Sequence, residues 1–297
     1  MPFLTRRRFL QAAAGAAATG ALVLAEDATI LEPNRPILVA MEIELARLPA
    51  AFDGFTIAQL SDFHYDPLSA VPIRAAIEIV NNLHPDLVVL TGDFVTVPIF
   101  HRRFHTAKLA ASAAEPCASL LAQLHPRLGM VSILGNHDVD SDVPRIIETL
   151  HSHGIPVLRN RSIPLEQGGS RVWLCGLDSV WEGHADVDRA LRGVPSHELV
   201  VLLVHEPDFA DQAALYPVDL QLSGHSHGGQ IWLPGIGAPW LPTLARKYPR
   251  GLHRIGPLTL YTNMGLGTIR LPIRLNCPPE VTLFTLRSGD GALKQNR

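Results

Sequence analysis

The sequence predicts an α/β fold, and three observations support this. Short, continuous apolar runs recur along the chain, as is typical of buried strands. Most neighbouring runs are separated by a stretch with helical periodicity. The chain has 297 residues, of which 47% are hydrophobic and 18% charged, so it is long enough for one substantial core.

The individual elements follow from the spacing of the apolar residues. An alternating edge strand is predicted over 37–45, and further strands over 55–60, 87–90, 130–134, 171–175, 199–204, 218–222, 258–261 and 281–286. Helices are predicted over 70–83, 109–124 and 144–153. Gly154 ends the third helix, because glycine readily adopts the left-handed conformation of a C-cap.

Five of these strands stop at a segment that carries Asp, Asn or His. The five segments are 61–64, 91–93, 135–138, 205–208 and 224–227. In an open α/β sheet, ligands bind outside the carboxyl ends of the strands. We therefore expect the five segments to converge on one site.

The segment 224–229 allows two interpretations. As a string, Gly224-His225-Ser226-His227-Gly228 matches the nucleophile elbow of serine hydrolases. Alternatively, His225 and His227 project from the same face of an extended backbone as metal ligands, with Ser226 as a spacer. The serine-hydrolase interpretation fails, because residues 228–234 are a poor helix start and no acid lies between Ser226 and the final histidine, His253.

The order of the motifs resembles that of the calcineurin-like metallophosphoesterases. The motifs are Asp62-x-His64, Gly92-Asp93, Gly135-Asn136-His137-Asp138, His205 and Gly224-His225-x-His227. Segments 228–230, 246–248, 265–267 and 277–280 are similar to the exported bacterial phosphodiesterase branch of that family. The resemblance implies a four-layer αββα sandwich of two mixed sheets flanked by helices.

The resemblance also implies a role for each motif residue. Asp62, His64 and His227 would bind one metal, Asn136, His205 and His225 a second, and Asp93 both. Carboxylate, amide and imidazole donors suit Mn, Fe or Zn. A pair of such ions would share a water and aim the resulting hydroxide in line at phosphorus.

Two further residues, His137 and Asp138, directly follow the predicted ligand Asn136. His137 would protonate the leaving oxygen or stabilise its charge, with Asp138 as its partner. The family often extends Gly-Asp to Gly-Asp-x-x-Asp, whereas this chain has Thr96 at the position of the second acid. That change leaves the bridging Asp93 in place.

The function expected from these residues is a dinuclear-metal phosphoesterase that acts on a phosphodiester or a pyrophosphate-linked substrate. The alternatives are a phosphomonoesterase and a metal-binding protein of the same fold that has lost catalysis. The retention of His137 and of all seven ligands argues against the second alternative. The sequence does not name the substrate, which leaves lipid-linked and nucleotide-sugar phosphoesters open.

Residues 1–25 are expected to be an export signal, followed by one metallophosphoesterase domain over 26–297. Arg6-Arg7-Arg8 with Phe9-Leu10 resembles a twin-arginine signal, which implies the twin-arginine export machinery as a partner and a periplasmic or other extracytoplasmic location. The apolar run 12–25 has 14 residues and is expected to be too short to span a bilayer. The sequence leaves open whether the signal is cleaved after Ala25 or kept as an anchor.

Composition bears on the remaining partners. A net charge of −3 and a pI near 6.5 give no global basic signal, so nucleic-acid binding is not expected. The basic, aromatic segment 100–105 would clamp a phosphate, touch anionic lipid or be a solvated loop. Segment 231–244, rich in Trp, Leu and Pro, would pack as a long loop, make peripheral membrane contact or wall a pocket for a lipid-bearing substrate. Cys117, Cys175 and Cys277 allow at most one disulfide.

Overall fold

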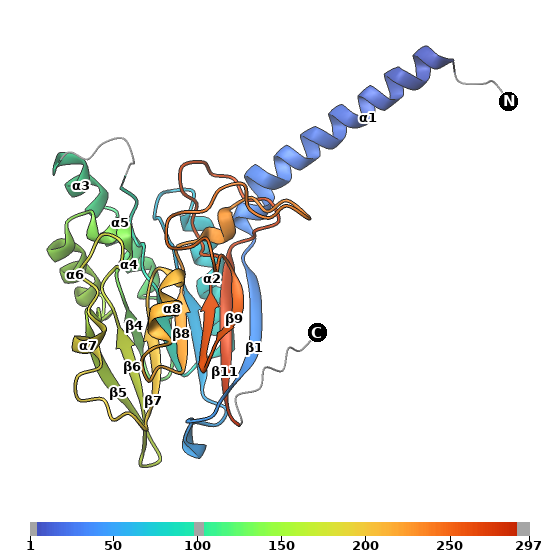
Figure 1. Cartoon of the computed structure of the whole chain (residues 1–297). Coiled ribbons are helices and arrows are strands. Elements are labelled where there is room, and N and C mark those ends of the chain that lie inside the picture. Colours follow the sequence, from blue (N-terminus) through green and yellow to red (C-terminus); the bar gives the residue numbers. More distant parts are fainter. Residues whose placement is uncertain (1–4, 98–103, 290–297) are drawn as a thin grey trace.

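The computed structural model describes residues 5–97 and 104–289. Two β-sheets pack face to face at its centre around a shared apolar core, and helices cover the outer face of each sheet (Figure 1). Both sheets contain parallel and antiparallel pairs. The predicted α/β class and the four-layer αββα sandwich of two mixed sheets are therefore confirmed.

The first sheet has the strand order β1-β11-β2-β3-β4. Its strands are β1 (Ile37–Leu45), β2 (Thr56–Leu60), β3 (Leu87–Leu90), β4 (Met130–Ser132) and β11 (Glu280–Ser288). Strands β2, β3 and β4 run parallel, and β11 joins them antiparallel to β2. The carboxyl ends of β2, β3 and β4 therefore meet at one edge of the sheet.

The second sheet has the strand order β5-β6-β7-β8-β10-β9. Its strands are β5 (Arg161–Gln167), β6 (Ser170–Gly176), β7 (Leu199–Leu203), β8 (Leu220–Ser223), β9 (Gly251–Ile255) and β10 (Leu258–Thr262). The four inner strands run parallel, whereas β5 and β9 pair antiparallel at the two edges. The carboxyl ends of β7 and β8 are therefore also neighbours.

Alternation along the strands explains the layers. In β7, Leu199, Val201 and Leu203 belong to the core between the sheets, whereas Val200 and Leu202 pack under the helices on the other face. The helices over the first sheet are α2 (Ala70–Leu83), α4 (Ala114–Leu121) and α6 (Val143–Ser152), and those over the second are α7 (Val187–Ala190) and α8 (Ala210–Ala213). Burial of one such aliphatic side chain contributes about 1.5–3 kcal/mol.

The structure corrects the predicted helix over 109–124 and adds two strands. In place of one helix there are α3 (Phe104–Ala111) and α4, because Pro116 cannot donate a hydrogen bond to the preceding turn and crowds its carbonyl groups. The added strands, β5 and β9, lie at sheet edges, and β5 contains Pro164. Cys117, Cys175 and Cys277 are buried free thiols.

The N-terminal helix α1 (Arg6–Glu26) extends away from the two sheets (Figure 1). Helical turns continue it, so that the helical segment Phe9–Asn34 has 26 residues and is long and apolar enough to cross a membrane. The expectation that this region is too short was therefore wrong, because it counted only the apolar run 12–25. A signal sequence and an anchor both meet this criterion of length and composition.

The last turns of this segment, 27–34, pack against the body. Ala28 and Pro33 are buried. Ala28 accepts a hydrogen bond from the backbone N–H of Arg274, and the carboxylate of Glu32 accepts from the backbone of Asn276 and Cys277. The N-terminal helix is thus joined to the chain just before β11.

The predicted basic loop over 100–105 lies only partly within the described residues. Its first four residues and the side chains of Phe104 and His105 lie outside the described residues. Its proposed phosphate or lipid contacts stay predictions.

Candidate metal centre

The seven predicted ligands meet at the carboxyl ends of strands from both sheets. Four come from the first sheet: Asp62 and His64 after β2, Asp93 after β3, and Asn136 after β4. Three come from the second sheet: His205 after β7, and His225 and His227 after β8. All seven side chains are buried. The predicted convergence of the strand ends is therefore what the fold produces.

Three groups of donor atoms could each hold a metal ion, with their atoms within 4.8 Å of one another. The groups are Asp62, His64 and His227; His64, Asp93 and His137; and Asp93, His205 and His225. Because the groups share members, they form one continuous cluster with two ends. His64 is shared by the first and second groups, and Asp93 by the second and third.

The backbone at this cluster is unusual. Five of the ligands adopt left-handed φ angles, which non-glycine residues rarely do: Asp62 (52°), His64 (40°), Asp93 (56°), His225 (69°) and His227 (50°). Each such residue costs on the order of 1–3 kcal/mol. The surrounding sheets hold these conformations, which turn several side chains from three different loops toward one point.

The carboxylate of Asp93 lies between the two ends of the cluster. Its Oδ2 atom is 3.1 Å from His205 Nε2 and 3.4 Å from His64 Nε2, and its Oδ1 atom accepts a hydrogen bond from the backbone of His137. Burial by itself would raise the pKa of Asp93, but the nearby His205 and His137 outweigh it and lower that pKa. The position between the two ends is the one that a bridging ligand requires.

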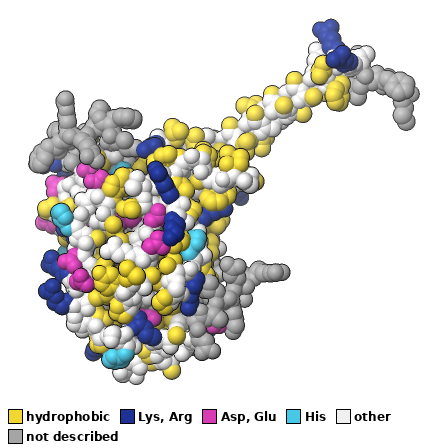
Figure 2. Space-filling view, viewed as in Figure 1, with side chains coloured by type: hydrophobic (Ala, Val, Ile, Leu, Met, Phe, Trp, Pro, Cys, Tyr) yellow, Lys and Arg dark blue, Asp and Glu magenta, His cyan; other side chains and the backbone are white. Residues whose placement is uncertain are grey.

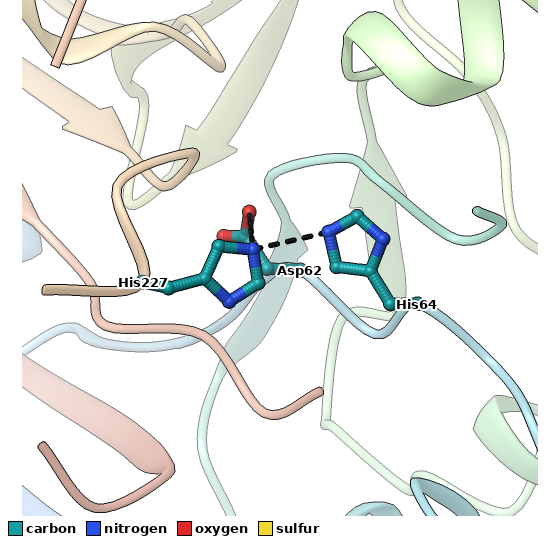
Figure 3. A group of neighbouring side chains, drawn as sticks. All are labelled: Asp62, His64 and His227. Atoms are coloured by element: carbon teal, nitrogen blue, oxygen red, sulfur yellow. Dashed lines mark hydrogen bonds and ion pairs between the residues drawn. The ribbon is translucent and has the colours of Figure 1, made fainter. Parts of the chain in front are cut away.

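At one end, Asp62, His64 and His227 point toward one another (Figure 3). The Nε2 atoms of the two histidines are 3.0 Å apart, and His227 Nε2 is 3.4 Å from Asp62 Oδ1. His64 Nδ1 lies 2.9 Å from Thr96 Oγ1. When that nitrogen donates to the hydroxyl, Nε2 presents its lone pair to the other two side chains.

At the other end, backbone carbonyl groups fix two imidazole rings. His205 Nδ1 lies 2.7 Å from the carbonyl oxygen of Thr91, and His225 Nε2 lies 2.8 Å from that of Thr243. A carbonyl oxygen only accepts, so each of these nitrogens carries the proton and the other nitrogen of each neutral ring has a free lone pair. This is the arrangement of a metal-ligating histidine.

Unpartnered buried atoms show that these residues fit metal ions. In the described part of the chain, Asn136 Oδ1 and His205 Nε2 are buried without a hydrogen-bond partner. Buried polar atoms are normally paired. Burial lowers the pKa of His205, but the carboxylates of Asp93 and Asp62 outweigh burial and raise it, so its Nε2 lies where positive charge is favoured. Divalent cations would satisfy both requirements.

His137 lies beside the cluster and lines the cavity above it. Its Nδ1 atom accepts a hydrogen bond from the backbone of Val97, and its ring packs edge-on against that of His64. Burial lowers the pKa of His137 to about 4 against the opposing effect of Asp93. The neutral ring therefore carries its proton on Nε2.

Asp138 is fully buried and binds backbone rather than a histidine ring. Its carboxylate accepts hydrogen bonds from the backbone N–H groups of Asp93, Phe94, Val95 and Gly135, at 2.8–3.2 Å. The sequence suggested His137 as its partner. The structure instead gives Asp138 the loop that carries Asp93, so its contacts fix the position of that ligand.

Two glycines allow loops of the site to approach closely. A Cβ atom at Gly135 would overlap the carboxylate and backbone of Asp93, and one at Gly224 would overlap Ser61 and the carboxylate of Asp62. Ser226 Oγ accepts a hydrogen bond from the backbone of Gly228. This contact belongs to the turn and fits a spacer.

A cavity of about 450 Å³ opens above the cluster. Five of the ligands and His137 lie at its floor: His64, Asp93, Asn136, His225 and His227. Its walls are largely apolar and include Trp181, Ile231, Trp240, Ile269, Leu271 and Ile273. Among the described residues that line it, Arg270 is the one Lys or Arg. The cavity thus combines a polar floor with an apolar wall.

Some residues at the cavity wall were not predicted from the sequence. Trp181 and Arg270 lie in loops without a periodic pattern, and the ring of Trp181 packs edge-on against that of His225 at 5.5 Å. Gln230 belongs to the Gly228-Gly229-Gln230 run that resembles the phosphodiesterase branch, but the resemblance gave this residue no role. Its amide group bonds the backbone of Ile269, Leu271 and Ile273 and so holds the cavity wall.

Comparison with known proteins gives the family. Residues 55–229 match the model of the calcineurin-like phosphoesterases. The chain is 36% identical over 294 residues to an uncharacterized metallophosphoesterase of Bacillus subtilis, YkuE, with 97% of this chain and 99% of that protein covered. It is 33% identical over 290 residues to Phosphodiesterase YaeI of Escherichia coli, with 95% and 99% covered.

A vertebrate relative extends the comparison. The chain is 32% identical over 280 residues to a zebrafish transmembrane protein with a metallophosphoesterase domain, with 89% of this chain and 60% of that protein covered. The matched region 55–229 contains all seven predicted ligands and His137. The chain therefore belongs to the calcineurin-like phosphoesterases, metal-dependent phosphoester hydrolases that use two divalent metal ions.

Proposed function

We propose that this protein is a membrane-attached or exported phosphodiesterase that hydrolyses a phosphodiester or a pyrophosphate-linked substrate with two divalent metal ions. The observation that carries the proposal is the cavity, whose floor is the donor cluster and whose walls are apolar. A relative of similar length is named as a phosphodiesterase, which agrees with it.

The cavity favours a diester over a monoester. A phosphomonoester is a dianion and gains from several cationic side chains, whereas a diester carries one negative charge and two organic groups. Among the described residues of the lining, the cationic side chain is Arg270, and the apolar part includes two Trp and three Ile side chains. Room beside the phosphorus for a second organic group is what a diester needs.

In this proposal the donors are divided between two ions. Asp62, His64 and His227 would hold one ion, and His205 and His225, with the unpartnered amide oxygen of Asn136, the other. Asp93 would bind both. The ions would supply positive charge at the phosphoryl oxygens and a water of lowered pKa as the nucleophile. The mixed oxygen and nitrogen donors suit Mn, Fe and Zn equally and do not select one of the three.

The remaining residues act around the substrate. His137 holds a proton on Nε2 and would donate a hydrogen bond from it to the leaving oxygen, which stabilises the charge that develops there. Asp138 would act as a positioning residue, because its hydrogen bonds hold the loop of Asp93. The apolar walls would exclude bulk water and so strengthen the electrostatic interactions at the cavity floor.

A substrate pair tests the proposal. Purified full-length protein with Mn²⁺ is assayed on a chromogenic aryl phosphodiester and on the matching aryl phosphomonoester. We expect at least about tenfold higher kcat/KM on the diester, or about 1.4 kcal/mol in transition-state stabilisation. Preference for the monoester would identify a phosphomonoesterase. Two bound metals without turnover of either substrate would identify a catalytically silent metal-binding protein.

We further propose that the protein is delivered by the twin-arginine route to the outer side of the cytoplasmic membrane. The paired arginines followed by Phe9-Leu10 and the apolar helical segment Phe9–Asn34 support this. Replacement of Arg6 and Arg7 by Lys should retain the protein in the cytoplasm of a bacterial host. Protease added to spheroplasts should degrade the exported wild type and leave the retained variant intact. Equal degradation of both would contradict the twin-arginine route.

A further inference from the structure

Three segments joined by hydrogen bonds lie where the N-terminal helix meets the body, and two of them, 229–242 and 268–277, carry residues that line the cavity. They are 27–34, 229–242 and 268–277, and together they are called the rim below. Leu275 exchanges backbone hydrogen bonds with Gln230 and Trp232, and Asn276 donates its side-chain amide to the carbonyl of Trp232. Glu32 accepts from the backbone of Asn276 and Cys277. The hydrogen bonds therefore make the rim one connected surface.

The rim exposes large apolar side chains that the fold does not bury. Ile30 is 57% exposed, Leu31 41%, Ile236 77%, Trp240 44% and Leu271 60%. Trp240 and Leu271 also line the cavity. Apolar surface therefore continues from the outside of the molecule into the cavity. Such a patch on one side of a pocket marks a binding surface.

The N-terminal helix indicates that a membrane covers this apolar patch. The helical segment Phe9–Asn34 is long and apolar enough to cross a membrane, none of its apolar window is buried, and its last turns belong to the rim. Figure 2 shows hydrophobic side chains along α1 and where α1 meets the body. A membrane that contains α1 therefore lies directly over the rim.

Tryptophan and arginine pairs on the rim fit the boundary between water and lipid. The guanidinium of Arg270 lies 4.2 Å from the ring of Trp240, and that of Arg250 lies 3.6 Å from the ring of Trp232. Tryptophan is enriched at the level of lipid headgroups, where one part of the ring is in contact with water. An arginine beside it can contact a lipid phosphate.

We propose that the rim lies in the interfacial layer of the membrane and that the cavity takes an amphiphilic phosphoester directly from the bilayer. The hydrocarbon chain of this substrate stays in the lipid, its phosphorus reaches the donor cluster, and the apolar wall formed by Trp240, Leu271 and Ile269 covers the segment between them. Arg270 contacts a second anionic group of the substrate or a neighbouring headgroup. This inference rests on the proposed function and names its substrate class.

The test uses the full chain reconstituted in vesicles of phosphatidylcholine and phosphatidylglycerol with Mn²⁺. Two substrates are compared: a water-soluble aryl phosphodiester and an aryl phosphodiester that carries a long alkyl chain and resides in the vesicle. The rim variant combines Leu31→Glu and Ile236→Glu, neither of which lines the cavity among the described residues. The control is Leu128→Glu, a leucine 57% exposed that precedes β4, at the end of the strands opposite the site.

The wild type is expected to hydrolyse both substrates and to prefer the alkyl-bearing one. The rim variant should lose at least about tenfold in kcat/KM on the alkyl-bearing substrate, because charges replace apolar side chains in contact with lipid. Its rate on the soluble diester, its metal content and its Tm should match those of the control. Rates of the rim variant that equal the wild type on both substrates, or that fall equally on both, would overturn the inference.

The same experiment separates this inference from the proposed function. A wild type that hydrolyses the soluble diester and gains nothing from the alkyl chain contradicts the membrane-fed cavity alone. A wild type that hydrolyses neither substrate contradicts both. As an independent measurement, vesicles with brominated acyl chains should quench Trp240, so that Trp240→Phe removes more quenching than Trp173→Phe, a change in β6 of the second sheet. Equal losses would contradict contact of the rim with lipid.

Discussion

The two ends of the parallel strands use aspartate in opposite ways. At the amino ends, Asp86 accepts hydrogen bonds from the backbone and hydroxyl of Thr56 and pairs with Arg127, and Asp219 forms a two-bonded pair with Arg47. At the carboxyl ends, Asp62 and Asp93 face imidazole nitrogens of the cluster. Protein cations compensate the first pair of carboxylates, whereas the second pair is left for added metal ions. Stability and function are thus located at opposite ends of the same strands.

The largest expected effect comes from removing the shared ligand. Asp93→Ala should abolish binding of both metals and lower kcat by more than about 10⁴-fold, because the carboxylate of Asp93 lies between His64 at one end of the cluster and His205 at the other. Metal content by mass spectrometry and turnover of an aryl phosphodiester measure this. Circular dichroism should show an intact fold. A variant with two metals and full activity would exclude Asp93 as the bridging ligand.

The next effect separates chemistry from metal binding. His137→Ala should lower kcat by about 10²–10³-fold, because the donor on Nε2 is lost, and should leave two metals bound. His84→Ala, a change at an exposed C-cap far from the cavity lining, serves as the control. Loss of metal in parallel with activity would show that His137 is a ligand.

Two glycines that flank β4 test the comparison within one strand. Gly135→Ala should weaken metal binding by about 10–100-fold, because its Cβ atom overlaps the carboxylate of Asp93. Gly129→Ala, at the amino end of β4, meets no atom within 4 Å and should cost about 1 kcal/mol through its φ of 89°. Metal titration and thermal unfolding distinguish the two outcomes. Equal metal affinity in both variants would contradict the assigned close contact.

The smallest expected effect on activity comes from the amino end. Asp219→Ala removes the partner of Arg47 and an acceptor for the backbone of Val200, and should lower the free energy of unfolding by about 2–4 kcal/mol. The kcat per folded molecule should not change, because Asp219 is remote from the cavity lining. Denaturant unfolding and active-site metal titration measure both. A loss of metal in this variant would contradict the assignment of stability to the amino ends of the strands and of function to their carboxyl ends.

Much of the site follows from sequence because of where its residues stand. Asp62, Asp93 and His205 each come just after an apolar run, and parallel strands bring such positions together whatever the loops do. The resemblance to a family added which residue would bind which ion. The partners of Asp138 could not be predicted, since its four hydrogen bonds depend on how the loop of Asp93 folds back.

Other parts of the fold depend on contacts that local patterns do not encode. The edge strands β5 and β9 form because neighbouring strands offer backbone partners, although their own side chains are partly exposed. The cavity walls from Trp181 and Arg270 come from irregular loops. The membrane-spanning length of the N-terminal helix depends on polar turns after Ala25 that an apolar count leaves out.

The donors of the cluster are far apart in the chain, and this has a consequence for how the protein matures. His64 and His227, whose Nε2 atoms are 3.0 Å apart, are separated by 163 residues and belong to different sheets. No growing fragment that ends before His227 can assemble both halves of the cluster. Occupancy of both metal positions therefore requires that synthesis has passed β8 and that strands of both sheets have folded together.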